Sequence, residues 1–102
     1  TGFTHSEFGR TLSSNGQGSD HGWGAHSMVF GGAVRGQDIY GAMPDLTLGG
    51  PDDIGEGRIL PRVGVDQYAA TLAKWFGLTP AELDQVFPNL PQFGASDLGF
   101  MG

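Results

Sequence analysis

The strongest hydrophobic pattern of the chain lies between Val65 and Phe76, where apolar residues recur at positions i, i+3, i+4 and i+7. This spacing is typical of an α-helix with one apolar face. Asp66 in the first turn and Lys74 in the last turn suit the helix dipole, and Gly77 suits a left-handed cap. We therefore expect a helix over residues 65–76 whose apolar stripe packs in a core. The stripe consists of Tyr68, Leu72, Trp75 and Phe76.

A second helix is predicted by the residues at its start. Thr79, Pro80 and Glu82 supply an N-cap, a proline at the first helical position and the glutamate of a capping box. The helical pattern continues to Phe87 and ends before Pro88. A helix is expected to end there because the residue preceding a proline is disfavoured in the α conformation.

The first part of the chain, residues 1–62, predicts Gly-rich loops with a few short strands. Residues 12–27 are rich in Gly and Ser and are predicted to form a loop by their turn chemistry. Residues 28–30 form a short apolar run, and residues 34–40 resemble two short strands about a Gly-containing turn. Residues 45–61 again predict a loop.

Taken together, these elements predict the α/β class and a single partial domain over residues 1–102. The second half holds two helices within residues 63–93, followed by a tail over residues 94–102. We expect the chain after Asn89 to be extended and docked through Phe93 and Phe100. Long loops without secondary structure are uncommon in a complete compact domain. We therefore expect the helices to pack against the rest of a longer parent chain or against a second copy; the alternative is a small, irregular but complete domain.

Composition and charge exclude several classes of protein. The chain has 102 residues, no Cys, and 5 Lys and Arg against 11 Asp and Glu, so its formal net charge is −6. Without Cys there is no disulfide and no thiolate metal site. So acidic a chain lacks the basic surface that nucleic-acid binding requires, and no apolar run reaches the ~20 residues of a membrane span.

A candidate metal site is formed by Asp20 and His21, with Glu7 as a further oxygen ligand. An aspartate and a neutral imidazole on adjacent loop residues bind one divalent cation if the backbone turns between them, and the flanking glycines permit such a turn. The alternative is structural: Asp20 caps a turn and His21 stacks on Trp23.

Arg10 is a candidate anion-binding residue, because a guanidinium pairs with an oxyanion through two parallel hydrogen bonds. Its alternative role is an ion pair with Glu7 or Asp20. The carboxylates at Asp52, Asp53 and Glu56 raise the possibility of calcium, but their spacing does not match an EF-hand and a solvated acidic loop is the better hypothesis.

Four motifs in order give the chain a family resemblance. They are SEFGRT at residues 6–11, DHGWG at residues 20–24, GGAVRG at residues 31–36 and VDQYAATL at residues 65–72. The chain resembles the C-terminal portion of the bacterial family known as domain of unknown function 1501, whose members are often exported by the twin-arginine route. The resemblance implies a periplasmic or exported protein.

That family is similar to the alkaline phosphatase and sulfatase superfamily, which implies an α/β sandwich with a divalent-metal centre. By this resemblance Ser6–Gly9 corresponds to one metal-binding motif of the superfamily, and His21-Gly22 corresponds to another. Glu7 replaces the expected aspartate and Phe8 replaces the histidine. The resemblance implies a parent that hydrolyses phosphate or sulfate esters; the alternative is a non-catalytic scaffold or ligand-binding protein with a degenerate metal site. In either case we expect the isolated chain to be inactive, because its nucleophile would lie upstream.

Overall fold

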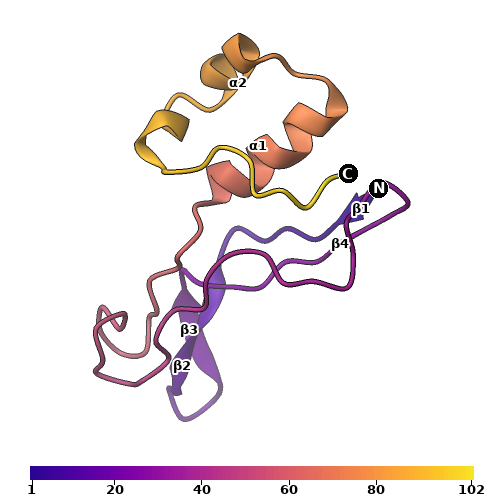
Figure 1. Ribbon diagram of the computed structural model, residues 1–102. Helices are drawn as coiled ribbons and strands as arrows, with labels where there is room; N and C mark the ends of the chain where they lie inside the picture. The colour runs from indigo at the N-terminus through magenta and orange to yellow at the C-terminus, as the bar shows by residue number, and fades with distance from the viewer. The chain divides into compact units, whose positions relative to one another are not determined.

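The computed structural model describes all residues 1–102 and contains short strands followed by helices (Figure 1). The elements are β1 (Gly2–Phe3), β2 (Gly9–Ser14), β3 (Ser19–Gly22), β4 (Val29–Phe30), α1 (Val65–Phe76), α2 (Pro80–Val86) and the 3₁₀ helix η1 (Leu90–Gln92). The strands form two two-stranded sheets, β1 with β4 and β2 with β3. This mixture agrees with the α/β class in its general sense.

The chain divides into two compact units, each described here by itself. The helical unit comprises Thr1, residues 30–41 and residues 63–102, and the hairpin unit comprises residues 2–29 and 42–62. Neither α1 nor α2 has the length and apolar character that crossing a bilayer requires.

Both predicted helices are confirmed, and their ends have the expected causes. At the start of α1 the Gln67 side chain accepts a hydrogen bond from the Gly64 N–H (2.9 Å), and Gly77 ends the helix with a positive φ of 126°. At the start of α2 the Thr79 Oγ1 accepts from the Glu82 N–H (3.3 Å), and the Glu82 carboxylate accepts from the Thr79 N–H (2.9 Å). The capping box predicted from the sequence is therefore present.

The buried face of α1 differs from the predicted stripe. Ala70 packs in a small core with Leu83 and Leu90, whereas Trp75 is 43% exposed and Phe76 82% exposed. The prediction that the whole stripe is core packing is thus wrong for its last two residues. Helical periodicity defines an apolar face, but it does not show which part of that face receives a neighbour.

The polar side of α1 holds the C-terminal segment, residues 95–101. Gln67 Nε2 donates to the Ala95 carbonyl (2.6 Å), and Lys74 Nζ donates to the Asp97 carboxylate (2.8 Å). Between them Thr71, only 2% exposed, donates through Oγ1 to the Gln67 carbonyl and accepts from the Leu98 N–H. These three helix residues stand at i, i+4 and i+7, so they share one side of α1.

Phe100 anchors this segment, as predicted. It is 4% exposed, and its ring lies 5.9 Å from the Tyr40 ring and 5.8 Å from the Tyr68 ring. The chain after Asn89 is not wholly extended, because it begins with η1, where Leu90 is buried. Phe93 is partly exposed and lies against Gly64.

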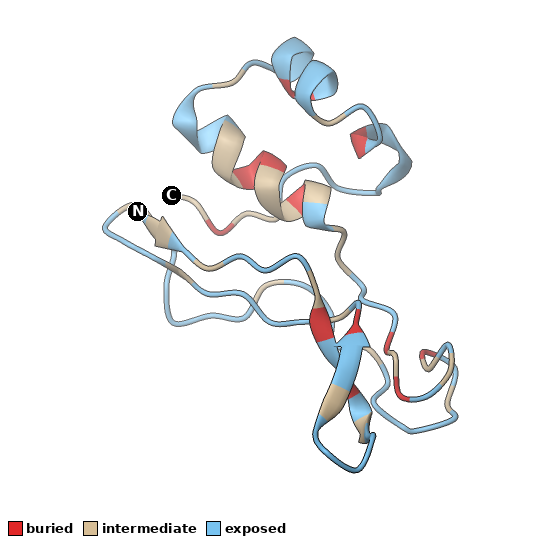
Figure 2. Ribbon diagram, turned by 180° about the vertical axis from the view of Figure 1, so that it is seen from behind, coloured by how far each residue is buried: buried red, intermediate tan, exposed pale blue.

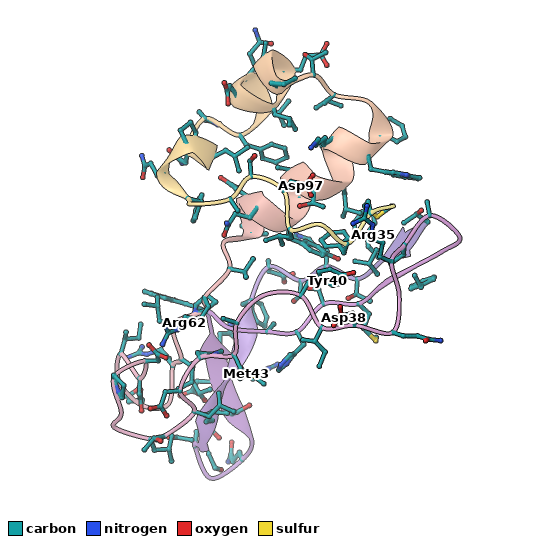
Figure 3. The ribbon with its side chains drawn as sticks, viewed as in Figure 1. Arg35, Asp38, Tyr40, Met43, Arg62 and Asp97 are labelled. Atoms are coloured by element: carbon teal, nitrogen blue, oxygen red, sulfur yellow. The ribbon has the colours of Figure 1, made fainter.

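Residues 34–40 do not form the two predicted strands. Val34 makes an isolated bridge with Met101, and the Arg35 N–H donates to the Phe100 carbonyl (2.8 Å). The Tyr40 hydroxyl donates to the Arg35 carbonyl (2.8 Å; both residues are labelled in Figure 3). Val34 and Arg35 therefore pair with the C-terminal segment instead of with a second strand inside residues 34–40, a distant pairing that local turn chemistry does not predict.

The predicted loop over residues 12–27 is also wrong, because most of it belongs to the β2–β3 hairpin. Gly9 pairs with Gly22 and Arg10 with His21, after which the register shifts before Ser14 meets Ser19. Residues 15–18 form the connection, and Gly16 and Gly18 both have positive φ there. The inward positions of β2 are small residues, so the strand lacks the alternation of large apolar residues by which strands are usually found.

Candidate functional site

The β2–β3 hairpin carries three of the four residues predicted to bind ligands, Arg10, Asp20 and His21, and brings Arg10 and His21 together. Arg10 and His21 are directly opposite in register, and the His21 imidazole stacks on the Phe8 ring with centroids 3.7 Å apart and planes 16° apart. The Arg10 guanidinium carbon lies 5.7 Å from the Phe8 centroid, within cation–π range. The predicted stacking of His21 is therefore present, but its partner is Phe8 and not Trp23.

Phe8 itself is held by its neighbour. Ser6 Oγ donates to the Phe8 carbonyl (2.8 Å), which fixes the approach to β2. The phenyl ring thus orients both Arg10 and His21, a role that the sequence analysis did not assign to it. Both residues remain exposed, so their polar groups are accessible from solvent.

Arg10 forms no salt bridge with Glu7 or Asp20, so its alternative role as an ion-pair partner is wrong. One of its terminal nitrogens donates to the Ser19 carbonyl (2.9 Å) across the hairpin. Three of the other four basic side chains form ion pairs, Arg58 with Glu56, Arg62 with Asp52 and Lys74 with Asp97, and the charge of Arg35 helps to lower the pKa of Asp97. Arg10 forms no ion pair, so its guanidinium has no carboxylate in direct contact.

Asp20 and His21 lie within β3 and not in a loop, which removes the premise of a backbone turn between them. Consecutive residues of a strand point to opposite faces. Asp20 is instead directed to the tip of the hairpin, where its carboxylate accepts from Asn15 Nδ2 (2.8 Å). Glu7 is exposed in the bend before β2.

The structure groups no three His, Cys, Asp or Glu side chains in a way that could hold a metal ion. The residues of this chain therefore do not fit a divalent cation by themselves. The metal site at Glu7, Asp20 and His21 stays a prediction about a longer protein that would supply further ligands.

The acidic loop, residues 45–62, uses its carboxylates to hold its own backbone. The Asp53 carboxylate accepts from the N–H groups of Gly49 (2.9 Å), Gly55 (2.8 Å) and Gly57 (3.1 Å). Asp52 is buried and accepts from the Asp45 N–H (2.6 Å) and from Arg62. The hypothesis of a solvated acidic loop is thus wrong for Asp52, and the carboxylates act as structural acceptors.

These hydrogen bonds lower two pKa values. The N–H groups of Gly49 and Gly55 hold the pKa of Asp53 below its ordinary 3.8, and the Asp45 N–H followed by Arg62 lowers the pKa of Asp52 from the same value. A carboxyl whose folded pKa is depressed stabilises the fold above its unfolded pKa, and this contribution is lost as pH falls through the folded pKa. The acidic loop should therefore loosen below about pH 4, the range set by the ordinary aspartate pKa.

Replacing Asp53 with Asn should remove much of this pH dependence and lower stability at neutral pH. The carboxylate uses one oxygen for the Gly49 N–H and the other for the Gly55 and Gly57 N–H groups, whereas an amide offers a single, weaker acceptor oxygen and leaves at least one N–H without its partner. The measurement is unfolding at a series of pH values between neutrality and acid. Asp84→Asn is the matched control, since Asp84 is exposed on α2. An acid transition that Asp53→Asn leaves unchanged would show that Asp53 does not contribute to it.

Comparison with known proteins gives one family. The family model described as a protein of unknown function, DUF1501, matches residues 3–87. No curated protein matches the chain, and no solved structure matches it. The matched region includes the whole β2–β3 hairpin and both α-helices.

Proposed function

Because the chain belongs to the DUF1501 family of proteins of unknown function, we propose its function from the site alone: the β2–β3 hairpin is a non-catalytic binding element that holds an anionic group on Arg10. The observation that carries this proposal is that Arg10, in a chain with a net charge of −6, forms no ion pair and uses one terminal nitrogen in a hydrogen bond to the Ser19 carbonyl. The ligand class is a phosphate, sulfate or carboxylate group.

The chemistry of the guanidinium supports this assignment. Arginine carries five N–H donors in a planar fork, and only one terminal nitrogen of Arg10 is engaged, with the Ser19 carbonyl. The remaining donors match the geometry of an oxyanion. Since the Phe8 ring lies beside both Arg10 and His21, it limits the freedom that their side chains lose when an anion binds.

The test is titration of the whole protein with inorganic phosphate and with sulfate, in which binding is measured by changes in the amide chemical shifts of the hairpin. Arg10→Ala should abolish the shifts, and Arg10→Lys should weaken them because lysine lacks the planar fork. Arg58→Ala is the matched control, since Arg58 lies beside Glu56. Shifts that are the same in Arg10→Ala as in the parent protein would refute the proposal.

The hypothesis of a metal-dependent ester hydrolase makes a different prediction about the same residues. It requires stoichiometric divalent metal in the purified full-length protein and a loss of ester hydrolysis in His21→Ala. Metal-free protein whose hydrolysis is unchanged by His21→Ala would exclude the hydrolase and leave the binding proposal standing. Export to the periplasm is likewise a proposal, which rests on the family resemblance.

The exposed apolar residues of the helical unit support a second, structural part of the proposal. Val65, Trp75, Phe76 and Val86 each expose more than two-fifths of their surface on α1 and α2 (Figure 2 shows the exposure of both helices). Apolar surface of this kind is favourably removed from water. We propose that it packs against another segment of a longer parent chain, and that in the isolated chain a second copy takes that place.

The isolated 102 residues should therefore self-associate, and Phe76→Ser should weaken the association because Phe76 is the most exposed of these four residues. Size-exclusion chromatography with light scattering over a range of concentrations measures it. Phe3→Ser, which removes an exposed phenylalanine of the hairpin unit, is the control. A monomer at every concentration would contradict the proposal.

A further inference from the structure

The connection between β2 and β3 has a feature that neither anion binding nor packing uses. Residues 15–18 are all exposed, as Figure 2 shows for the loop of the hairpin, and they begin with the pair Asn15-Gly16. A Cβ placed on Gly16 would meet nothing within 4 Å, so the peptide that follows Asn15 is open to approach. We propose that Asn15 is a modification site, at which the folded protein deamidates spontaneously.

The Asn15 side chain is held against the peptide that would attack it. Its Oδ1 accepts from the Gln17 N–H (2.9 Å), and its Nδ2 donates to the Asp20 carboxylate (2.8 Å). The first bond closes a turn over Gly16, which keeps the amide carbon near the Gly16 nitrogen. The second fixes the orientation of the group that would leave, so the reactants are positioned before the reaction begins.

The reaction needs only water. The Gly16 backbone nitrogen gives up its proton to solvent and attacks Cγ of Asn15, so that a C–N bond forms. The bond from Cγ to Nδ2 breaks, and Nδ2 takes a proton and leaves as ammonia. Water then adds to one carbonyl of the resulting succinimide ring and opens it to aspartate or isoaspartate.

Two neighbouring groups, and the absence of a side chain on Gly16, assist the attack of the Gly16 nitrogen on Asn15. The Gln17 N–H faces the oxygen that becomes negative when the nitrogen adds to Cγ, so it acts as an oxyanion donor. Ser14 Oγ accepts the Gly16 N–H (3.1 Å) and lies where that proton departs. The missing side chain of Gly16 removes the steric barrier that any other residue would present.

The product changes the hairpin. A new carboxylate at position 15 faces the carboxylate of Asp20, where a hydrogen bond existed before. Like charges at this distance repel, and the net charge falls by one from −6 to −7. Deamidation should therefore loosen the tip of the hairpin, with an additional backbone atom in the isoaspartate form.

The experiment is incubation of the folded whole protein at mildly alkaline pH, followed by peptide mapping that separates aspartate from isoaspartate. Asn89 is an internal control, because it is the other asparagine of the chain and is followed by the buried Leu90. We expect Asn15 to be converted and Asn89 to remain an amide. Conversion of both at equal rates, or of neither, would overturn the proposal.

Two pairs of variants test the geometry. Gly16→Ala should slow the conversion strongly, whereas Gly18→Ala should not, although both positions have a positive φ that alanine rarely adopts, 92° at Gly16 and 152° at Gly18. Asp20→Ala should slow it by releasing Nδ2, whereas Asp38→Ala should not. If Asp20→Ala and the urea-unfolded chain both convert Asn15 as fast as the folded protein, the folded geometry contributes nothing and the proposal fails.

Discussion

Phe100→Ala should lower the free energy of unfolding of the helical unit by about 3–5 kcal/mol, the range for removing a buried phenylalanine. Phe100 is 4% exposed and lies between the rings of Tyr40 and Tyr68. Truncation removes the apolar contact of the whole ring and two aromatic contacts, which contribute about 0.5–1.5 kcal/mol each beyond burial. The loss is large because little else in this unit is buried.

Phe100→Ala should also disturb residues outside the space that the ring fills. The Arg35 N–H and the Phe100 carbonyl are hydrogen-bonded, so loss of the anchor also frees residues 33–40. Denaturant unfolding followed by circular dichroism measures the effect, with amide hydrogen exchange at Arg35 and Leu98 as a local measure. Phe30→Ala is the matched control, because Phe30 is 63% exposed, belongs to the helical unit and lies outside the apolar surface of α1 and α2, so its truncation should cost less than about 0.5 kcal/mol. Equal effects of the two variants would show that Phe100 is not an anchor.

The helices could be predicted because their causes are local. The capping box of Thr79 and Glu82 and the cap at Gly77 involve residues close in sequence, and each has a specific backbone requirement. The burial of α1 could not be predicted in the same way. Its buried positions include Gln67 and Thr71, because the C-terminal segment that covers them offers backbone groups as hydrogen-bond partners and not apolar side chains.

The hairpin was missed for a related reason. Large apolar residues reveal a strand by their alternation, but β2 buries Gly9 and Thr11, and Thr11 is retained there by hydrogen bonds to the Ser13 carbonyl and from the Asp20 N–H. A loop over residues 12–27 would allow Asp20 and His21 to bind one ion together. Their position in β3 separates them, and a metal motif inferred from spacing alone depends on a backbone conformation that the spacing does not fix.

In the candidate anion site too, the chemistry of the side chain could be predicted from the sequence, but its surroundings could not. That Arg10 is able to bind an oxyanion follows from its chemistry, and the sequence analysis proposed it on that basis. That Arg10 forms no ion pair is a tertiary property, because it depends on where Asp52, Glu56 and Asp97 contact Arg62, Arg58 and Lys74. The stacking of Phe8 on His21 likewise depends on the register of the hairpin.

Gly9→Ala should destabilise the hairpin unit by more than about 3 kcal/mol, beyond the usual cost of overpacking. A Cβ on Gly9 would overlap the carbonyl group of Gly24, and a backbone carbonyl cannot rotate out of the way as a flexible side chain does. The φ of Gly9 lies outside the left-handed region, so alanine is tolerated by the local backbone and the clash alone decides the outcome.

Gly32→Ala separates this clash from the general effect of replacing a glycine. Gly32 also lies outside the left-handed region and its Cβ would meet nothing within 4 Å, so alanine there should stabilise by about 0.4–1 kcal/mol through the unfolded state. The two variants should therefore shift the unfolding midpoint in opposite directions. Because Gly9 precedes Arg10, Gly9→Ala should also lose the phosphate-induced shifts, and Gly32→Ala should keep them. If Gly9→Ala unfolds like Gly32→Ala, the close approach of β2 to Gly24 does not exist in solution, and the placement of Arg10 that depends on it is wrong.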